Sequence, residues 1–281
     1  MIQILGMPFQ QSSKWSSSSI ESVIINQMIK APEVYNFQSV AELNFELKFR
    51  KNIIESAKAM SKGKSRFASF ATSRCNPRFW HLTNVGGFWQ RHDVKPADAI
   101  RDIFINSELY RFDCSTAKVI IYYHAALNSI GEHLFNRLFQ NIYLYGWHFD
   151  PDLGIRALYS NRHFIPGDIL YIKNPDFDPR TPWWRGENAV VLEDGKFFGH
   201  GLGIRSIEEM IQLLNKKRRP GSNQSAYLTN IIARPSFKHL AYLSMQPYRF
   251  SSIKIQNVII HHNQSSLSFV EYLYYLLSAI K

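Results

Sequence analysis

The sequence contains little cysteine: Cys75 and Cys114 are the only two among 281 residues. Two cysteines exclude a multi-disulfide framework and a cysteine-rich metal site. One bridge between them stays open, although two free thiols in a reducing compartment fit this usage better. The 45% apolar and 14% aromatic content predicts a well-packed globular protein rather than a disordered chain.

Long hydrophobic runs are also absent. The longest apolar stretches, such as Val119 to Leu127, are interrupted and much shorter than a membrane span. The start of the chain, from Met1 to Met7, lacks the basic region, apolar region and cleavage site of a secretion signal. We therefore expect a soluble protein that is made in the cytoplasm and does not associate with membranes.

Acidic residues are too few to balance the basic ones. The chain has 33 Lys and Arg against 22 Asp and Glu, a formal net charge of +11. Such a surface favours acidic partners. The charge is spread along the chain, however, and no zinc-finger, RNP or glycine-rich phosphate-loop signature accompanies it. We expect a basic surface and no nucleic-acid binding.

Helical periodicity dominates the first half of the chain. Residues 1–20 are rich in Ser and Gln and read as a flexible leader. Ser39, followed three residues later by Glu42, has the pattern of a helix N-cap. Apolar spacing predicts helices over Ile20–Ala31, Ser39–Met60, Pro96–Asn106, Ile207–Asn215 and, with a wide apolar face, Cys114–Phe139.

Strand-like runs follow the long Cys114–Phe139 helix. They cover Ile142–Trp147, Ile169–Ile172, Val190–Leu192 and Lys196–His200, each bounded by turn residues. Helices followed by strands favour an α+β fold, with a central buried helix packed on a small antiparallel sheet and additional N-terminal helices. We expect one domain over residues 21–232. Residues 233–281 show no clear period and are predicted to be a C-terminal extension packed on the core or trailing from it.

Cys114 lies at the start of the predicted central helix. Asp113 and Ser115 are helix-capping residue types, which places the thiol within a residue or so of the helix N-terminus. Backbone N–H groups and the helix dipole lower the pKa of a thiol there and favour the nucleophilic thiolate. On this local context alone, an inert buried thiol is the stronger interpretation, because such thiols are common.

The segments after Cys114 have the layout of papain-like and NlpC-like cysteine hydrolases. Asp113-Cys114-Ser115 opens the helix, and Gly167-Asp168 precedes an apolar strand. Those enzymes begin the next strand with the histidine that pairs with the cysteine. This sequence has Glu187 at that place.

With that substitution, the chain resembles the spore-associated protein-glutamine gamma-glutamyltransferases of spore-forming bacteria. The resemblance runs from roughly Ser39 to Tyr227, and its motifs are specific in combination rather than singly. Besides Cys114, they are Ala41–Leu43, Phe45–Leu47, Ala99–Ile103, Ile120–Tyr123, Lys173–Pro175, Trp184–Asn188, His200–Gly203 and Ser225–Leu228.

The resemblance implies a Cys–Glu pair in place of Cys–His. Cys114 attacks the carboxamide of a substrate glutamine, and Glu187 shuttles protons to the leaving ammonia and from an incoming lysine amine. This role requires a Glu187 pKa raised towards neutrality by dry surroundings. The alternative is a surface carboxylate paired with Arg185. The family usually has Glu before the cysteine, so Asp113, one methylene shorter, is a third catalytic candidate whose direct reach is in question.

Further residues are expected around this pair. His200 could be the base of an ordinary Cys–His dyad, but it lies where NlpC-like enzymes hold the residue that orients the base. We treat it as a supporting residue, together with Asn188. The resemblance places Phe67, Trp147 and Trp184 around a substrate channel, where they would exclude water; otherwise they are ordinary core or rim aromatics.

The sequence thus predicts a transglutaminase that uses neither a metal nor a cofactor. It would join accessible glutamine and lysine side chains of proteins, specifically spore coat proteins in the mother-cell cytoplasm. Two alternatives stay open: an NlpC-like peptidase or amidase acting on cell wall, and a basic, non-enzymatic coat-assembly protein with an inert Cys114.

Overall fold

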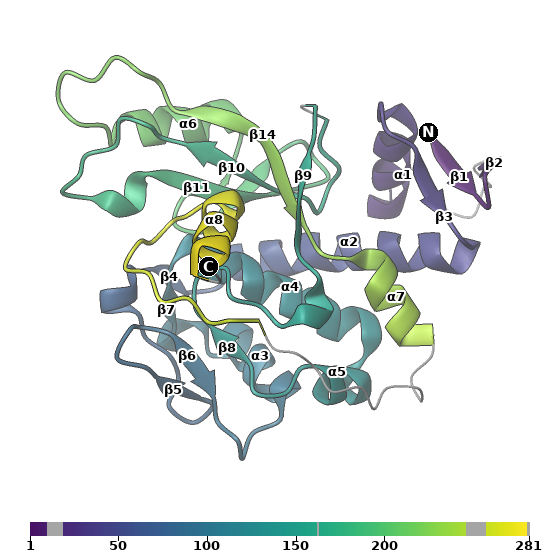
Figure 1. Ribbon diagram of the computed structural model, residues 1–281, viewed down its shortest axis with the longest axis horizontal. Coiled ribbons are helices and arrows are strands. Elements are labelled where there is room, and N and C mark those ends of the chain that lie inside the picture. Colours follow the sequence, from purple (N-terminus) through teal and green to yellow (C-terminus); the bar gives the residue numbers. More distant parts are fainter. Residues whose placement is uncertain (10–18, 162, 246–256, 280–281) are drawn as a thin grey trace.

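The computed structural model describes residues 1–9, 19–161, 163–245 and 257–279. A six-stranded antiparallel sheet lies over two long helices, α2 and α4, with further helices and a small three-stranded sheet beyond them (Figure 1). The α+β architecture predicted from the sequence, with a central buried helix against an antiparallel sheet, is confirmed.

The helices before Cys114 begin close to the predicted positions. They are α1 (Ile20–Lys30), α2 (Val40–Lys62) and α3 (Pro96–Ile105). The Ser39 side chain accepts a hydrogen bond from the Glu42 backbone N–H at 3.1 Å, which confirms the predicted N-cap. Short 3₁₀ turns accompany them at Phe70–Thr72 and Ser107–Leu109, and later at Pro151–Leu153 and Pro182–Trp184.

The central helix is shorter than predicted. It comprises α4 (Cys114–Ile130), and Gly131 separates it from α5 (Glu132–Leu138). Gly131 has φ +83°, a backbone conformation that a continuing α-helix cannot contain. The predicted single helix to Phe139 is therefore wrong in its last turns. Nearly every residue of α4 is buried, as the wide apolar face indicated.

The six-stranded sheet has the order β13-β12-β11-β10-β14-β9. The β11–β12 hairpin was expected from the turn residues between Val191 and Lys196. Helix α6 (Ile207–Asn215), predicted with the same bounds, packs Met210 and Leu214 on the sheet. In chain order the strands are β9 (Arg156–Tyr159), β10 (Ile169–Lys173), β11 (Gly186–Val191), β12 (Phe197–Gly199), β13 (Gly203–Arg205) and β14 (Tyr227–Arg234).

Short strands form three smaller sheets. They are β1 (Ile2–Ile4), β2 (Met7–Pro8) and β3 (Tyr35–Phe37); β4 (Arg66–Phe67) and β7 (Arg111–Phe112); and β5 (Trp80–Leu82), β6 (Phe88–Gln90) and β8 (Tyr143–Leu144). The first sheet differs from the expected leader over residues 1–20. β1 pairs in parallel with β3, because Ile2 buries its side chain in the main core. The rest of that segment, residues 10–18, lies outside the described residues.

The predicted C-terminal extension begins inside the sheet. Strand β14 crosses residue 233 and lies between β10 and β9, so the domain does not end there. The described residues after β14 include the helices α7 (Phe237–Met245) and α8 (Phe269–Ala279). Phe237, Leu240 and Ala241 join the main core, which the sequence pattern alone did not reveal.

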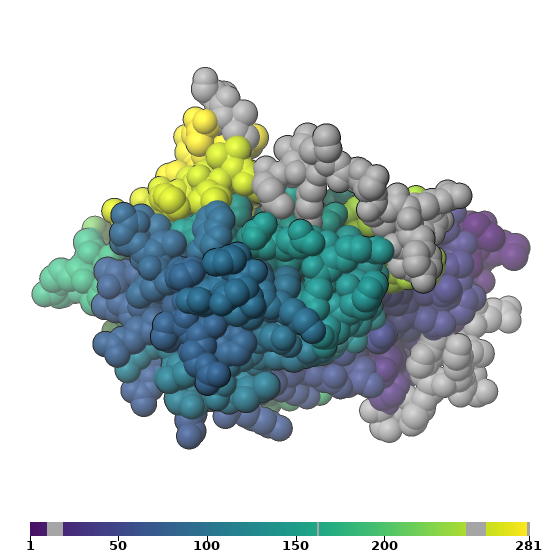
Figure 2. All heavy atoms as spheres, turned by 90° about the horizontal axis from the view of Figure 1, so that it is seen from below, coloured from purple at the N-terminus to yellow at the C-terminus, as the bar shows by residue number. Residues whose placement is uncertain are grey.

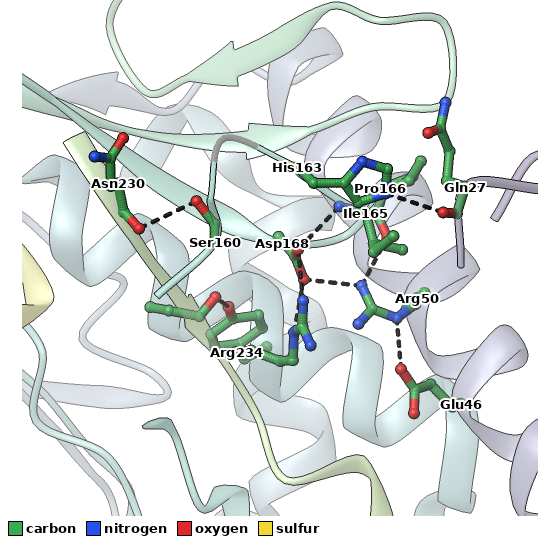
Figure 3. A network of polar contacts seen from close by, with 12 residues as sticks. Gln27, Glu46, Arg50, Ser160, His163, Ile165, Pro166, Asp168, Asn230 and Arg234 are labelled. Atoms are coloured by element: carbon green, nitrogen blue, oxygen red, sulfur yellow. Dashed lines mark hydrogen bonds and ion pairs between the residues drawn. The ribbon is translucent and has the colours of Figure 1, made fainter. Parts of the chain in front are cut away.

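A buried ion-pair network joins the sheet to α2 (Figure 3). The Asp168 carboxylate accepts from Arg50 Nη1 at 2.9 Å and from Arg234 at 2.8 Å, and Arg50 also pairs with Glu46. Burial alone raises the pKa of Asp168, but the guanidinium groups of Arg234 and Arg50 outweigh burial and hold the pKa below its ordinary value. The Gly-Asp motif before β10 is thus a structural anchor.

Candidate active site

Cys114 is the first residue of α4 and is fully buried. Asp113 is the N-cap of this helix, since its carboxylate accepts hydrogen bonds from the backbone N–H groups of Ser115 and Thr116. Both hydroxyl groups of those residues also donate to it. The cap orients the sulfur at the helix end, as the sequence predicted.

Glu187 lies in β11 beside this helix end and is only 2% exposed. Gly199, on the neighbouring strand β12, leaves room for its carboxyl group: an added Cβ would lie 3.1 Å from Glu187 Oε1. Burial raises the pKa of Glu187 to about 8, against the Lys118 charge and a hydrogen bond from the His200 backbone N–H. The alternative of a surface carboxylate paired with Arg185 is wrong, because the side chain is buried.

The environment of the Cys114 sulfur is polar but dry. Asn188 Nδ2 donates to Sγ over 3.4 Å. Burial raises the pKa of the thiol, and the neighbouring Glu187 and Asp113 carboxyl groups raise it further; the Ser266 hydroxyl and the Asn188 backbone N–H act in the opposite direction. Because Cys114 is fully buried in this structure, burial affects the thiol pKa more than the helix N-terminus does, and the thiol is protonated.

Cys114 and Glu187 are close enough to affect each other's charge. Among the described residues, Glu187 Oε1 has no hydrogen-bond partner, which is uncommon for a buried oxygen. A buried carboxyl oxygen without a partner, beside a thiol, can accept or deliver a proton without first breaking another bond. The two predicted catalytic residues are thus close to each other in a buried site.

Lys118 is a fully buried cation that sequence reasoning missed. It lies one helical turn after Cys114, donates from Nζ to the Phe198 carbonyl at 3.3 Å, and sits 4.7 Å from the centre of the Phe198 ring. Burial lowers its pKa, while Glu187, Cys114 and Asp113 act to raise it. The four-residue spacing from Cys114 was the available signal, because it places both side chains on one face of a helix.

His200 does not act through its ring in this arrangement. Its imidazole stacks on Phe112 at 4.6 Å, and burial lowers its pKa to about 3, so the ring is neutral. The contact with Glu187 comes from the backbone N–H of His200. The supporting role of His200 stays a prediction, and the low pKa of its ring disfavours a Cys–His dyad.

The three predicted channel aromatics fall into two groups. Trp147 is buried next to Asn188, and both side chains border a cavity of about 210 Å³ between the sheet and the start of α8. Phe67 and Trp184 stack on each other with ring centres 6.3 Å apart. Phe67 also lies near Gly201, just after His200: a Cβ added at Gly201 would be 3.1 Å from the Phe67 Cβ.

The C-terminal segment reaches this site, which the sequence did not indicate. The Leu267 carbonyl accepts from Asn188 Nδ2 at 2.8 Å and from Trp147 Nε1 at 3.0 Å. The Ser266 backbone N–H donates to Asp113 Oδ2 at 3.3 Å. Residues about 150 positions after Cys114 therefore complete its surroundings.

The rest of the described structure bears on metal sites, other cavities and membrane-spanning helices. No cluster of three or more His, Cys, Asp or Glu suited to a metal ion occurs among the residues that the structure describes. A larger hollow of about 760 Å³ between β3, β9, β14 and α7 contains no cysteine. No helix in the described ranges has the length and apolar character needed to cross a membrane.

Comparisons with known proteins point to one family. A family model described as "Protein-glutamine gamma-glutamyltransferase" matches residues 1–244. Relatives of that name include one from Halalkalibacterium halodurans, 48% identical over 99% of this chain and 98% of its own length. Another, from Bacillus subtilis, is 40% identical over 80% of this chain and 91% of its own length.

A solved structure, described as "Transglutaminase from Geobacillus stearothermophilus (without C-terminal extension)", is similar to this one. It has a TM-score of 0.70 and 48% sequence identity, and the match covers 73% of this chain and 97% of that one. With the buried Cys114 and Glu187 in place, these similarities establish that the chain belongs to the protein-glutamine gamma-glutamyltransferase family.

Proposed function

We propose that Cys114 and Glu187 transfer the γ-glutamyl group of a protein glutamine to a lysine amine. The Cys114 thiol loses its proton to Glu187 and attacks the carboxamide carbon. Glu187 returns the proton to the departing ammonia, which leaves a thioester. The lysine amine then attacks the thioester, and its proton restores the thiol as the isopeptide bond forms.

The observation that carries this proposal is the buried Glu187 beside the thiol. Its pKa, raised to about 8, lets it hold or give up a proton near neutral pH, as a general acid and base must. Glu187 takes the place at which NlpC-like enzymes have histidine, and the buried, neutral His200 ring is a poor alternative.

Lys118 supplies a positive charge to this dry site. When a proton passes from Cys114 to Glu187, or when both groups ionise, the buried ammonium stabilises the negative charge. Lys118 is a positioning residue, because it is held by the Phe198 carbonyl rather than by the reacting atoms. Asp113 has a similar standing, since its oxygens are occupied by the helix cap and by Ser266.

Dryness favours transfer over hydrolysis. Water competes with the lysine amine for the thioester, so the complete burial of the Cys114 sulfur favours cross-linking. Phe67 and Trp184 are half-buried, which suits the lining of a passage to the surface better than a closed core.

Incorporation of a fluorescent primary amine into a glutamine-bearing protein tests the activity. We expect incorporation by the parent chain and none by Cys114→Ala. Equal incorporation by the variant would contradict the proposal. Release of ammonia without amine incorporation would instead indicate a hydrolase, the second function considered from the sequence.

We further propose spore coat proteins as the substrates and the mother-cell cytoplasm as the site of synthesis. The support is the resemblance to spore-associated enzymes and the net charge of +11, which favours an acidic protein layer. Binding of the purified protein to intact spores, compared with spores stripped of their coat, tests this. Equal binding to both would contradict it.

A further inference from the structure

The C-terminal residues Gln264–Ser268, which we call the strap, lie directly over Cys114. Ser266 and Leu267 are at most 1% exposed, and the Cys114 sulfur beneath them is fully buried. The strap belongs to the part of the chain beyond the family match, which ends at residue 244. The catalytic core is therefore covered by a segment that the family model does not include.

Most contacts of the strap with the site are made by its main chain. The Leu267 carbonyl accepts from both Trp147 Nε1 and Asn188 Nδ2. Tyr171 Oη donates to the Ser266 carbonyl at 3.1 Å, and the Ser266 N–H donates to Asp113 Oδ2. Such contacts recognise a backbone or an amide rather than one particular side chain, so any chain with a suitably placed carbonyl can satisfy them.

The Leu267 carbonyl and the Cys114 sulfur share one hydrogen-bond donor, Asn188 Nδ2. The Asn188 Nδ2 group that donates to this carbonyl at 2.8 Å is also 3.4 Å from the Cys114 sulfur. Two N–H donors that converge on one oxygen beside a nucleophile form the arrangement that stabilises an oxyanion in acyl transfer. The sulfur and the two donors would therefore act on the same carbonyl group.

The conformation of the strap is stabilised by the neighbouring helix α8 rather than by the intrinsic backbone preferences of the strap residues. Ser266 has φ +64°, a left-handed conformation uncommon for a residue other than glycine. The anchor is α8, in which Phe269 packs on Trp147 with ring centres 5.0 Å apart and Tyr272 is 1% exposed. Figure 2 shows α8 as a ridge raised above the body of the molecule.

We propose that the strap occupies, within its own chain, the site for the carbonyl group of the glutamine substrate. Trp147 and Asn188 are the donors of that site, and the strap must withdraw before a substrate reaches Cys114. The strap is thus a built-in competitor of the acyl donor. This inference rests on the proposed function for the identity of the displaced substrate, but not for the covering of the thiol.

Alkylation of Cys114 by iodoacetamide in the full-length chain measures how often the strap opens. Peptide mapping distinguishes Cys114 from Cys75. Phe269→Ala weakens the anchor, and Ser266→Pro forbids the left-handed conformation and removes the N–H that donates to Asp113. Leu277→Ala, at a 65% exposed position of the same helix, is the matched control.

We expect alkylation of Cys114 at least about ten-fold faster in Phe269→Ala and Ser266→Pro than in the parent and Leu277→Ala, together with a higher kcat/KM for amine incorporation. Unchanged alkylation in both opened variants, with thermal unfolding showing that at least one of them is folded, would overturn the proposal. Faster alkylation with no amine incorporation by any variant would support the covering of Cys114 by the strap and would contradict the proposed function instead.

Trp147→Phe tests whether the strap and the substrate share one site. The variant keeps an aromatic ring but loses the N–H donor. We expect faster alkylation, because the Leu267 carbonyl loses a partner, together with a kcat lower by about 10²-fold, because the substrate carbonyl loses the same partner. Faster alkylation with parental kcat would refute the shared carbonyl site.

Discussion

Substitution of Gly199 by alanine tests how closely catalysis depends on the position of the Glu187 carboxyl group. The added Cβ would lie 3.0 Å from Glu187 Cγ and 3.1 Å from its Oε1. Ordinary carbon contacts are about 3.5–4.0 Å, so the side chain must withdraw by roughly 0.5–1 Å. Because Glu187 is buried on all sides, this movement changes its distance from the Cys114 sulfur.

A displacement of this size is expected to lower kcat by about 10- to 100-fold, since a misplacement of about 1 Å can cost about 10²-fold in rate. The corresponding rise in the activation free energy is about 1.4–2.7 kcal/mol. Overpacking should lower the free energy of unfolding by about 1–3 kcal/mol. Steady-state amine incorporation and urea unfolding measure the two effects separately.

Gly63→Ala is the matched control. Its added Cβ would lie 3.1 Å from Ser107 Oγ, a similar crowding of a polar side chain, but at the end of α2 and outside the site. We expect a kcat close to that of the parent. A folded Gly199→Ala variant with parental kcat would refute the reasoning that Glu187 must stay in its observed position.

Three further changes probe the charges of the molecule. In Lys118→Met, loss of the cation should raise the pKa of Glu187 above about 8 and move the corresponding limb of the pH profile of kcat/KM to higher pH; an unshifted limb would contradict the role of Lys118. The folded-state pKa of Glu187, about 8, lies above its ordinary value of 4.5. The contribution of this group to the unfolding free energy is therefore greatest below pH 4.5, and it is lost as the pH rises from 4.5 through about 8. Glu187→Gln should therefore flatten the fall of unfolding free energy over this range by on the order of 5 kcal/mol, as measured by urea unfolding at a series of pH values. Asp168→Asn should cost about 3–5 kcal/mol of unfolding free energy, because it removes the buried carboxylate that pairs with Arg234 and leaves Arg50 only its pair with Glu46; a loss within experimental error would show that the network is dispensable.

Local patterns in the sequence were sufficient for the starts of the helices up to α4 and for the place of Cys114 at a helix N-terminus. Ser39 and Asp113 are side chains that cap helices by short-range hydrogen bonds, so the starts of α2 and α4 could be predicted from neighbouring residues. The assignment of Glu187 depended on the resemblance rather than on its local context. The prediction failed at Gly131, where a glycine was treated as tolerated inside a helix although it marks the end of α4.

Long-range contacts account for what the sequence did not reveal. Strand β14 has no strict alternation, because it is paired on both edges and its burial depends on β10, β9 and α6. The strap is rich in serine and reads as a loop by composition, yet its main-chain groups meet donors that are 79 and 120 residues away in the chain. No periodicity reports such contacts, since they depend on where the backbone passes and not on which side chains it carries.

The direct test of the Cys114 and Glu187 mechanism is the acyl-enzyme itself. A glutamine-containing peptide is incubated with the full-length chain without an amine, the mixture is quenched in acid, and the protein is analysed by intact mass and peptide mapping. We expect an adduct equal to the peptide minus ammonia on Cys114, absent from Cys114→Ala and strongly reduced in Glu187→Gln. An adduct on another residue, or amine incorporation by Cys114→Ala at the parental rate, would contradict the mechanism.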